Sequence, residues 1–339
     1  MKGLKSIIFA AAALIAVPTV VSSCSDWTEP EAEDFYKPQT PAYKNNLKDY
    51  FASPHKVMFG WFGSWSAGSK SNSLVGLPDS TDFVSLWLVN GNLTADQQAD
   101  LKAFQARGSK AVLCWRAGNI GANLIPEIGF GSQSLEQLEE YWGYSRDDKE
   151  SMIEAAKKYA YAIVDTCLKY NIDGFDYDIE DWGTLMNSTY REVPNTFMRT
   201  LREEFDKHGM MLVADIPGAS SWLSFYDVLD NDVLESLDYI AWQTYELDHS
   251  GLNSFFNAIK NRNGKADVFE CVVKKSIVTA TFERASDKDL FPVQSTWKYS
   301  GGIEHAGQGA YHIEYDYPGN PDYPYVRKGI ATQNPPINN

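Results

Sequence analysis

The stretch from Asn171 to Trp182 reads Asn-Ile-Asp-Gly-Phe-Asp-Tyr-Asp-Ile-Glu-Asp-Trp. Within it, acidic residues stand at every second position, at Asp176, Asp178 and Glu180. Side chains of a β-strand point alternately to its two faces, so the three carboxyl groups would share one face. The residues between them are bulky and favour strands, which predicts that the other face packs against helices.

Three acids on one buried face repel one another, so at least one must hold a proton near neutral pH. Such an arrangement is typical of a site for acid–base chemistry. An acidic edge strand is one alternative, but it would not carry aromatic residues between its acids. A calcium loop is another, but it needs Asn, Asp and Gly spacers. The stretch therefore predicts a buried strand that performs acid–base work.

The composition favours one large domain and a neutral ligand. The chain has 339 residues, of which 44% are hydrophobic and 14% aromatic. That is enough for an α/β barrel of about 250 residues with extensions. The formal net charge of −15 argues against a nucleic-acid partner, because phosphate binding needs basic patches. The 10 Trp and 19 Tyr suit a glycan, whose apolar faces stack on rings, although many of them could be core residues.

The N-terminal residues are typical of export. Lys2 and Lys5 precede an apolar segment, Ile7–Val21, that is too short to span a membrane as a mature helix. The segment ends in Val-Val-Ser-Ser-Cys24, which resembles a bacterial lipobox, in which the cysteine is lipidated and becomes the new N-terminus. We therefore expect a lipoprotein signal peptide over residues 1–23. An ordinary secretory signal cleaved nearby is the alternative.

The next segment, residues 24–49, is expected to be a lipidated acidic tether that precedes one domain over residues 50–339. It is rich in acids and carries prolines up to Pro41, a composition that favours a flexible linker. Acids directly after Cys24 resemble the surface-export signal of Bacteroidetes lipoproteins. The resemblance implies an outer-membrane, lipid-anchored protein on the cell surface.

The remaining cysteines are Cys114, Cys167 and Cys271. Their number is odd, their spacing matches no zinc motif, and two lie in apolar runs, so we expect buried free thiols. The five histidines include no His-x-x-x-His pair. We expect neither a metal site nor a cofactor.

Eight apolar, β-rich runs recur along the chain, several of them separated by helical patterns. Besides the acidic stretch they are Lys56–Trp61, Phe83–Val89, Lys110–Trp115, Met210–Ile216, Tyr239–Tyr245, Ser276–Phe282 and Ala310–Tyr315. This order predicts an α/β fold, a single-domain (β/α)8 TIM barrel. An open doubly wound sheet is the main alternative, but the first loop lacks a Gly-x-Gly-x-x-Gly phosphate motif.

Helices and long loops are expected between these runs. The helical patterns cover Thr94–Arg107, Asp147–Tyr170, Pro194–His208 and Leu252–Lys260. Thr94 is the expected N-cap residue of the first, and Gly209 follows the end of the third. The expected loops are Gly63–Ser80, Gly118–Tyr144 and Glu283–Gly309. They follow strands and would form the walls of a cleft.

In such barrels the active site lies at the C-terminal ends of the strands. Glu180 would be the acid nearest the substrate, with Asp178 and Asp176 progressively deeper. On the sixth run, Gln243 and Tyr245 are two residues apart and share a face. They would offer an amide and a phenol to the same cavity.

The octapeptide from Asp173 to Glu180 resembles the Asp-Gly-x-Asp-x-Asp-x-Glu signature of glycoside hydrolase family 18. The resemblance implies retaining, substrate-assisted hydrolysis of a glycoside. Glu180 would be the acid and base, and Asp178 would bind the N–H of the substrate's acetamido group. Asp176 would share a proton with Asp178, and Tyr245 would hold the acetamido oxygen.

The family contains chitinases, endo-β-N-acetylglucosaminidases and non-catalytic lectin-like members. The presence of Glu180 argues against the last group. Gln243-Thr-Tyr245 resembles the Gln-x-Tyr of the endoglycosidases, whereas chitinases usually carry Met-x-Tyr. Cys114-Trp-Arg-Ala-Gly118 also departs from the Ser-x-Gly-Gly motif of chitinases. These features imply cleavage of the N,N′-diacetylchitobiose core of N-glycans. Large loops favour complex-type glycans, and a chitinase-like enzyme and a glycan-binding protein remain alternatives.

Further contacts to substrate are expected from Gln243, Asp173 and aromatic residues near strand ends. These aromatic residues are Trp61, Trp65, Trp115 and Trp182, and packing is the alternative role for each. The expected partners are N-glycans of glycoproteins and the membrane, through the lipid on Cys24. We expect a monomer, which surface glycan-import proteins could accompany.

Overall fold

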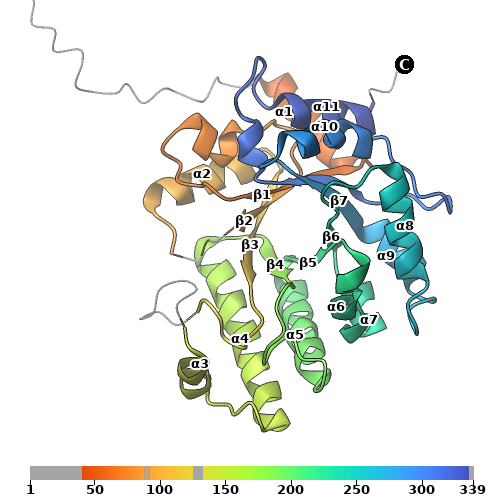
Figure 1. Cartoon of the computed structure of the whole chain (residues 1–339). Helices are drawn as coiled ribbons and strands as arrows, with labels where there is room; N and C mark the ends of the chain where they lie inside the picture. The colour runs from red at the N-terminus through yellow and green to blue at the C-terminus, as the bar shows by residue number, and fades with distance from the viewer. Residues whose placement is uncertain (1–39, 88, 90–91, 125–132, 336–339) are drawn as a thin grey trace, which may run out of the picture. The chain divides into compact units, whose positions relative to one another are not determined.

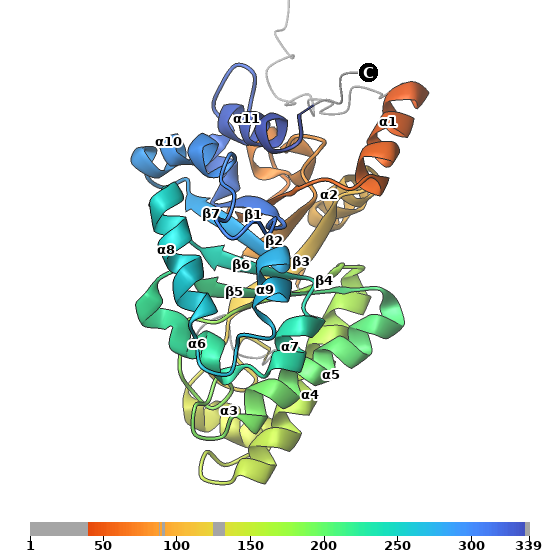
Figure 2. The ribbon, with the colours of Figure 1, turned by 90° about the vertical axis from the view of Figure 1, so that its right-hand side faces the viewer.

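The protein folds as a closed barrel of eight parallel strands, hydrogen-bonded in chain order, with helices around it (Figures 1 and 2). The computed structural model describes residues 40–87, 89, 92–124 and 133–335. The strands are β1 (Val57–Phe62), β2 (Phe83–Trp87), β3 (Lys110–Arg116), β4 (Gly174–Asp178), β5 (Met211–Pro217), β6 (Tyr239–Gln243), β7 (Ser276–Thr281) and β8 (Gly307–Tyr311). The predicted (β/α)8 barrel is confirmed.

The helices begin and end where the local sequence supplies caps. They are α1 (Pro41–Ala52), α2 (Ala95–Gln105), α3 (Leu135–Trp142), α4 (Lys149–Tyr170), α5 (Glu192–His208), α6 (Leu223–Val228), α7 (Asn231–Ser236), α8 (His249–Lys260), α9 (Phe269–Lys275), α10 (Ala285–Gln294) and α11 (Pro324–Gln333). Thr94 caps α2 in a reciprocal arrangement with Gln97, as predicted. Within the described ranges, no helix has the length and apolar character needed to cross a membrane.

The alternation along β4 separates two buried layers. Phe175 and Tyr177 point outward, where the Tyr177 ring packs edge-on against Phe197 of α5 at 5.4 Å. Asp176 and Asp178 point into the barrel and are 0% and 1% exposed. The predicted division of this strand into an acidic inner face and an aromatic outer face is confirmed.

Two segments differ from the predictions near the C-terminus. Strand β8 begins at Gly307, three residues earlier than the predicted run, and its Gly-Gln-Gly-Ala-Tyr sequence is not typical of strands. Its pairing with β1 and β7 stabilises it, and that pairing exists only once the barrel closes. The predicted loop Glu283–Gly309 contains helix α10.

The predicted tether is also too long at its C-terminal end. Residues Pro41–Ala52 form α1, with Thr40 as its N-cap and Leu47 buried. The Tyr43 hydroxyl donates to Asp79 at 2.6 Å, which fastens the helix to the domain. The predicted signal peptide and the lipidation residue Cys24 lie outside the described residues.

We expect Gly174→Ala to lower the free energy of unfolding by about 3 kcal/mol. Gly174 begins β4 with a φ of 149°, and a Cβ there would lie 2.0 Å from the Met211 carbonyl oxygen. Urea unfolding measures the effect. Gly209→Ala is the control: Gly209 has a φ of 66° but no atom within 4 Å of a Cβ. It should lose only about 1 kcal/mol, and equal losses in the two variants would contradict the close-contact argument.

Candidate active site

A cavity of about 230 Å³ opens at the C-terminal ends of the strands. Every strand except β7 contributes a residue within two positions of its C-terminal end. The lining residues are Trp61, Trp87, Arg116, Asp178, Glu180, Asp215, Gln243, Tyr245 and Tyr311. The structure therefore brings together Asp178, Glu180, Gln243 and Tyr245, as the sequence predicted.

Asp176 lies at the bottom of the site, below the cavity. Its Oδ2 atom accepts hydrogen bonds from Trp61 Nε1 at 3.1 Å and from Ser85 Oγ at 2.6 Å. Asp178 lies two residues further along β4, nearer the cavity. It is paired with Asp215 of the neighbouring strand β5. The Oδ1 atoms of Asp176 and Asp178 are buried and have no hydrogen-bond partner within the described part of the chain.

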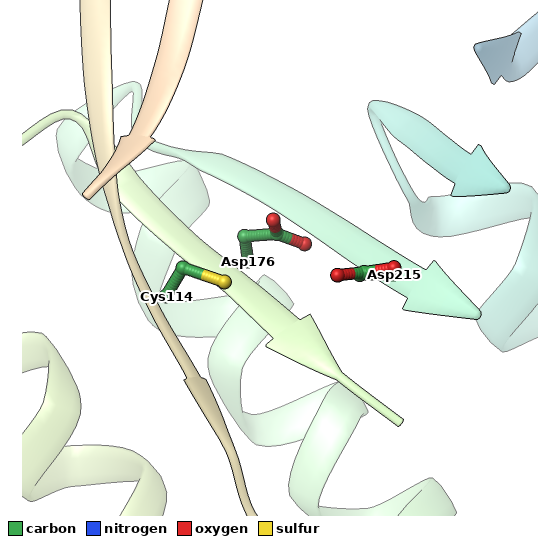
Figure 3. Close-up of side chains that lie close together, drawn as sticks. All are labelled: Cys114, Asp176 and Asp215. Carbon is green, nitrogen blue, oxygen red and sulfur yellow. The ribbon is translucent and has the colours of Figure 1, made fainter. Parts of the chain in front are cut away.

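Asp176 also meets Asp215 and a cysteine inside the barrel. The side chains of Cys114, Asp176 and Asp215 converge from β3, β4 and β5 (Figure 3), and their ligand-type atoms lie within 4.8 Å of one another. Burial, reinforced by the nearby carboxylates, raises the pKa of the Cys114 thiol well above its usual range. A thiol that keeps its proton can donate a hydrogen bond to the carboxyl groups beside it.

The deep carboxyl groups hold protons that exposed ones would lose. Burial raises the pKa of Asp176 to about 6. Burial raises the pKa of Asp178 well above its usual range, and the charges of Glu180 and Asp176 add to the rise. Burial and the charge of Asp178 do the same to the pKa of Asp215. The inner carboxyl groups are therefore protonated in part near neutral pH, in agreement with the argument from sequence.

Glu180 lies two residues beyond the end of β4, at the rim. Its Oε1 accepts from Gln243 Nε2 at 2.5 Å, and its Oε2 accepts from Arg116 Nη1 at 3.1 Å. Gln243 Nε2 also donates to Asp215 Oδ1 at 3.1 Å, and Arg116 Nε lies 2.8 Å from Asp181 Oδ2. The Gln243 nitrogen thus serves two carboxyl groups, which leaves its oxygen to accept from a ligand.

Tyr245 lies two residues beyond the end of β6 and completes the wall. Its ring stacks near that of Tyr311, with centroids 6.2 Å apart. Burial and the carboxylates nearby raise the pKa of Tyr245 well above its usual range. The phenol therefore keeps its proton and is a hydrogen-bond donor toward the cavity.

Asp173 was predicted to bind substrate, and this prediction is wrong. It precedes β4 and so lies at the opposite end of the barrel from the cavity. Its Oδ2 accepts from the backbone nitrogen of Ala111 at 2.8 Å and from Gln105 Nε2 at 2.9 Å. Asp173 joins β4 to β3 and α2, which is a structural role.

Two of the predicted aromatic contacts are also wrong. Trp115 is completely buried, and its Nε1 donates to the Tyr159 hydroxyl of α4 at 2.8 Å. It points outward from β3 because its neighbours on either side, Cys114 and Arg116, serve the inner face. Trp65 is buried against α2, where its Nε1 donates to Asp100 at 2.8 Å. Neither ring reaches the cavity.

The other two predicted aromatic residues lie near the site. Trp61 lines the cavity but is only 1% exposed, so its main contact is the hydrogen bond to Asp176. Trp182 is 44% exposed at the rim and stacks on Phe225 with centroids 4.4 Å apart. A ligand outside the cavity can reach it.

Four lining residues were not predicted as site residues: Trp87, Arg116, Asp215 and Tyr311. Asp215 could have been predicted from the sequence, because it is an acid within an otherwise apolar run and shares a strand face with Val213, two residues before it. Arg116 is likewise a charged residue directly after the third predicted run, Lys110–Trp115. Tyr311 was missed because its strand was predicted three residues too late.

We expect Asp176→Asn to stabilise the fold at neutral pH. In the folded protein this carboxyl loses its proton near pH 6, against an ordinary value of 3.8. Folding therefore takes up a proton between these values, and stability falls as pH rises from about 4 to about 6. An amide does not ionise, so it does not lose stability as the pH rises, and its oxygen can still accept the hydrogen bonds from Trp61 and Ser85. The gain should reach about 3 kcal/mol at about pH 7.5 and be smaller at about pH 4.5.

Urea unfolding of both proteins at the two pH values measures this difference. Asp165→Asn, on the exposed face of α4, removes one carboxylate outside the barrel and is the control. If Asp176→Asn is no more stable than the parent at neutral pH, then burial of the Asp176 carboxylate does not lower the free energy of unfolding, and the prediction is contradicted.

Comparison with known proteins agrees with this geometry. A family model described as "Glycoside hydrolase family 18, BT1044-like" matches residues 28–332. A solved structure of a BT1044 variant is 31% identical, with a TM-score of 0.71, and the match covers 88% of this chain and 94% of that chain. A search of curated proteins found no match.

Two further solved structures share the fold. An endo-β-N-acetylglucosaminidase from Cordyceps militaris is 21% identical, with a TM-score of 0.62 and coverage of 88% of this chain and 97% of that chain. A family 18 chitinase from Pseudoalteromonas aurantia is 14% identical, with a TM-score of 0.54 and coverage of 81% and 99%. The family model spans nearly all of the described barrel, and the chain therefore belongs to glycoside hydrolase family 18, as a glycosidase of the BT1044-like group.

Proposed function

We propose that the protein is an endo-β-N-acetylglucosaminidase that cleaves the β-1,4 bond of the N,N′-diacetylchitobiose core of N-glycans. The observation that carries the proposal is the set formed by Glu180, Gln243, Asp178 and Tyr245 around one cavity. It combines an acid at the rim with two groups that suit an acetamido substituent. The cavity is smaller than the range of about 300–1,000 Å³ typical of drug-sized ligands, so it suits a single sugar ring.

In the first step, the acetamido oxygen of the bound sugar attacks its own anomeric carbon. The Tyr245 hydroxyl donates to that oxygen and aligns it, and Asp178 accepts from the acetamido N–H. Glu180 gives its proton to the glycosidic oxygen as the bond to the leaving sugar breaks. The product is an oxazolinium ion, whose positive charge the carboxyl pair Asp178 and Asp176 stabilises.

In the second step, water attacks the anomeric carbon from the side that the leaving sugar has vacated. Glu180, now a carboxylate, takes a proton from this water, and the ring opens to restore the acetamide. Arg116 and Gln243 stabilise the charge that Glu180 carries between the two steps. Two displacements at one carbon retain its configuration.

Gln243 supports an N-glycan substrate over a linear polymer. It occupies the position where the resemblance to endoglycosidases lies, and it links Glu180 to Asp215. The chitinase alternative rests on the shared barrel, which the Pseudoalteromonas aurantia enzyme also has. Within the proposal we prefer complex-type glycans, because the segments that follow the strands, such as Gly63–Ser80, are long.

We expect the protein to release glycans from an immunoglobulin and to leave one N-acetylglucosamine on each asparagine. Glu180→Gln should lower the rate by about 10²–10⁴-fold, because it removes the acid and base but keeps the shape. Mass spectrometry of the glycoprotein measures both. Glu270→Gln, on the exposed face of α9, should match the parent.

The alternatives give different results in the same assay. Cleavage of chitooligosaccharides with no mass shift on high-mannose, hybrid or complex glycoproteins would replace the proposal with a chitinase-type activity. A glycan-binding protein would cleave neither substrate, and its binding would be the same with Gln at position 180.

We further propose that the mature protein is anchored to the outer membrane through a lipid on Cys24, with the barrel at the cell surface. Cys24→Ala should then move the protein from the membrane fraction to the soluble fraction and leave catalysis unchanged. Protease treatment of intact cells tests the surface location. Equal membrane association of the parent and the variant would contradict the lipid anchor.

A further inference from the structure

Two exposed tryptophans, which follow β4 and β5 in the chain, share one buried ring. Trp182 and Trp222 are 44% and 46% exposed, whereas Phe225 is completely buried. The Phe225 ring stacks on Trp182 at 4.4 Å with an interplanar angle of 29°. It also stacks on Trp222 at 5.9 Å with an angle of 12°. We call these three residues the aromatic platform.

Single exposed aromatic residues are common, but two indoles held side by side form an apolar surface that a soluble protein usually buries. The two indole rings have similar orientations because both stack on the buried ring of Phe225. Exposed hydroxyl groups surround it in the sequence, at Ser220, Ser221 and Ser224. Flat rings beside hydroxyl groups suit a neutral sugar, which has an apolar face and polar edges, better than an apolar protein partner.

The platform is continuous with the catalytic groups. Trp182 follows Glu180 by two residues, so the two residues lie within about 7 Å along the backbone. Asp181, between them, is paired with Arg116, which also binds Glu180. Trp222 follows β5, whose Asp215 lines the cavity. The platform therefore begins at the rim on the β4–β5 side.

The direction of the substrate follows from the proposed reaction. The cavity takes one sugar, and Glu180 protonates the oxygen between that sugar and the leaving one. The leaving sugar must therefore lie on the Glu180 side, beyond the cavity. The opposite end of the bound ring would then face Trp61, Trp87 and Tyr311, the lining residues that come from β1, β2 and β8.

We propose that the aromatic platform binds the leaving sugar, which is the 2-acetamido sugar that stays on the asparagine. This inference rests on the proposed function and names the subsite on its product side. Stacking of this sugar on Trp182 or Trp222 holds the glycosidic oxygen within reach of Glu180. The platform positions the substrate and takes no part in proton transfer.

Steady-state kinetics on a glycopeptide tests the platform. Trp222→Ala should raise KM about fivefold with kcat within about twofold, because a stacking contact is lost while the acid stays in place. Trp222→Phe keeps a ring and should recover most of the loss, and Trp182→Ala should act in the same direction. Tyr161→Ala removes a comparably exposed ring, 47% exposed on α4, and should match the parent.

A second substrate distinguishes the loss of this stacking contact from a general loss of activity in the variant. When the same glycan is linked to a nitrophenyl group in place of the asparagine-linked sugar, Trp222→Ala should change KM much less. An unchanged KM on the glycopeptide, or an equal rise on both substrates, would overturn the inference. Failure of the parent protein to cleave either substrate would instead overturn the proposed function.

Binding of N-acetylglucosaminyl-asparagine gives an independent measurement. Ligand-observed NMR with Glu180→Gln protein should detect this product analogue, and the further change Trp222→Ala should weaken its binding about fivefold. Equal binding with and without the Trp222 ring would contradict the platform, whatever the activity of the parent protein.

Discussion

The structure depends on keeping several carboxyl groups inside a barrel from which water is largely excluded. An unpaired buried carboxylate is unstable, so each inner acid must keep a proton or receive hydrogen bonds. Asp176 receives them from Trp61 of β1 and Ser85 of β2, which only the closed barrel brings to β4. The acid cluster is therefore stabilised only when the barrel closes.

Depth assigns different roles to similar side chains. Asp176 and Asp178 are enclosed, and burial raises the pKa of both, so they share protons within the barrel. The Glu180 side chain is 29% exposed and lines the cavity. Arg116 of β3 and Gln243 of β6 hold it in place. In the proposed mechanism, this one strand supplies both the acid that exchanges protons with the substrate and the carboxyl pair that stabilises the positive charge of the intermediate.

The barrel and its rim make separate contributions to function. The barrel is shared with structures named as chitinases and as an endo-β-N-acetylglucosaminidase, so the strands alone do not choose the glycan. We propose that the choice of glycan depends on groups beyond the strand ends. On the β4–β5 side, Trp182 and Trp222 are such groups, and both stack on the buried ring of Phe225.

Local periodicity determined much of this protein from sequence alone. Alternation along β4 and β6 correctly predicted that Asp178, Glu180, Gln243 and Tyr245 share a cavity, because side-chain direction in a strand is a local property. The outward direction of Trp115, the position of Asp173 below the barrel and the role of glycine-rich β8 depended on neighbours distant in sequence. The meeting of Asp215 with Gln243, and of two indoles on one phenyl ring, was likewise decided only by the tertiary structure, because closure of the barrel sets which strand ends and loops lie side by side.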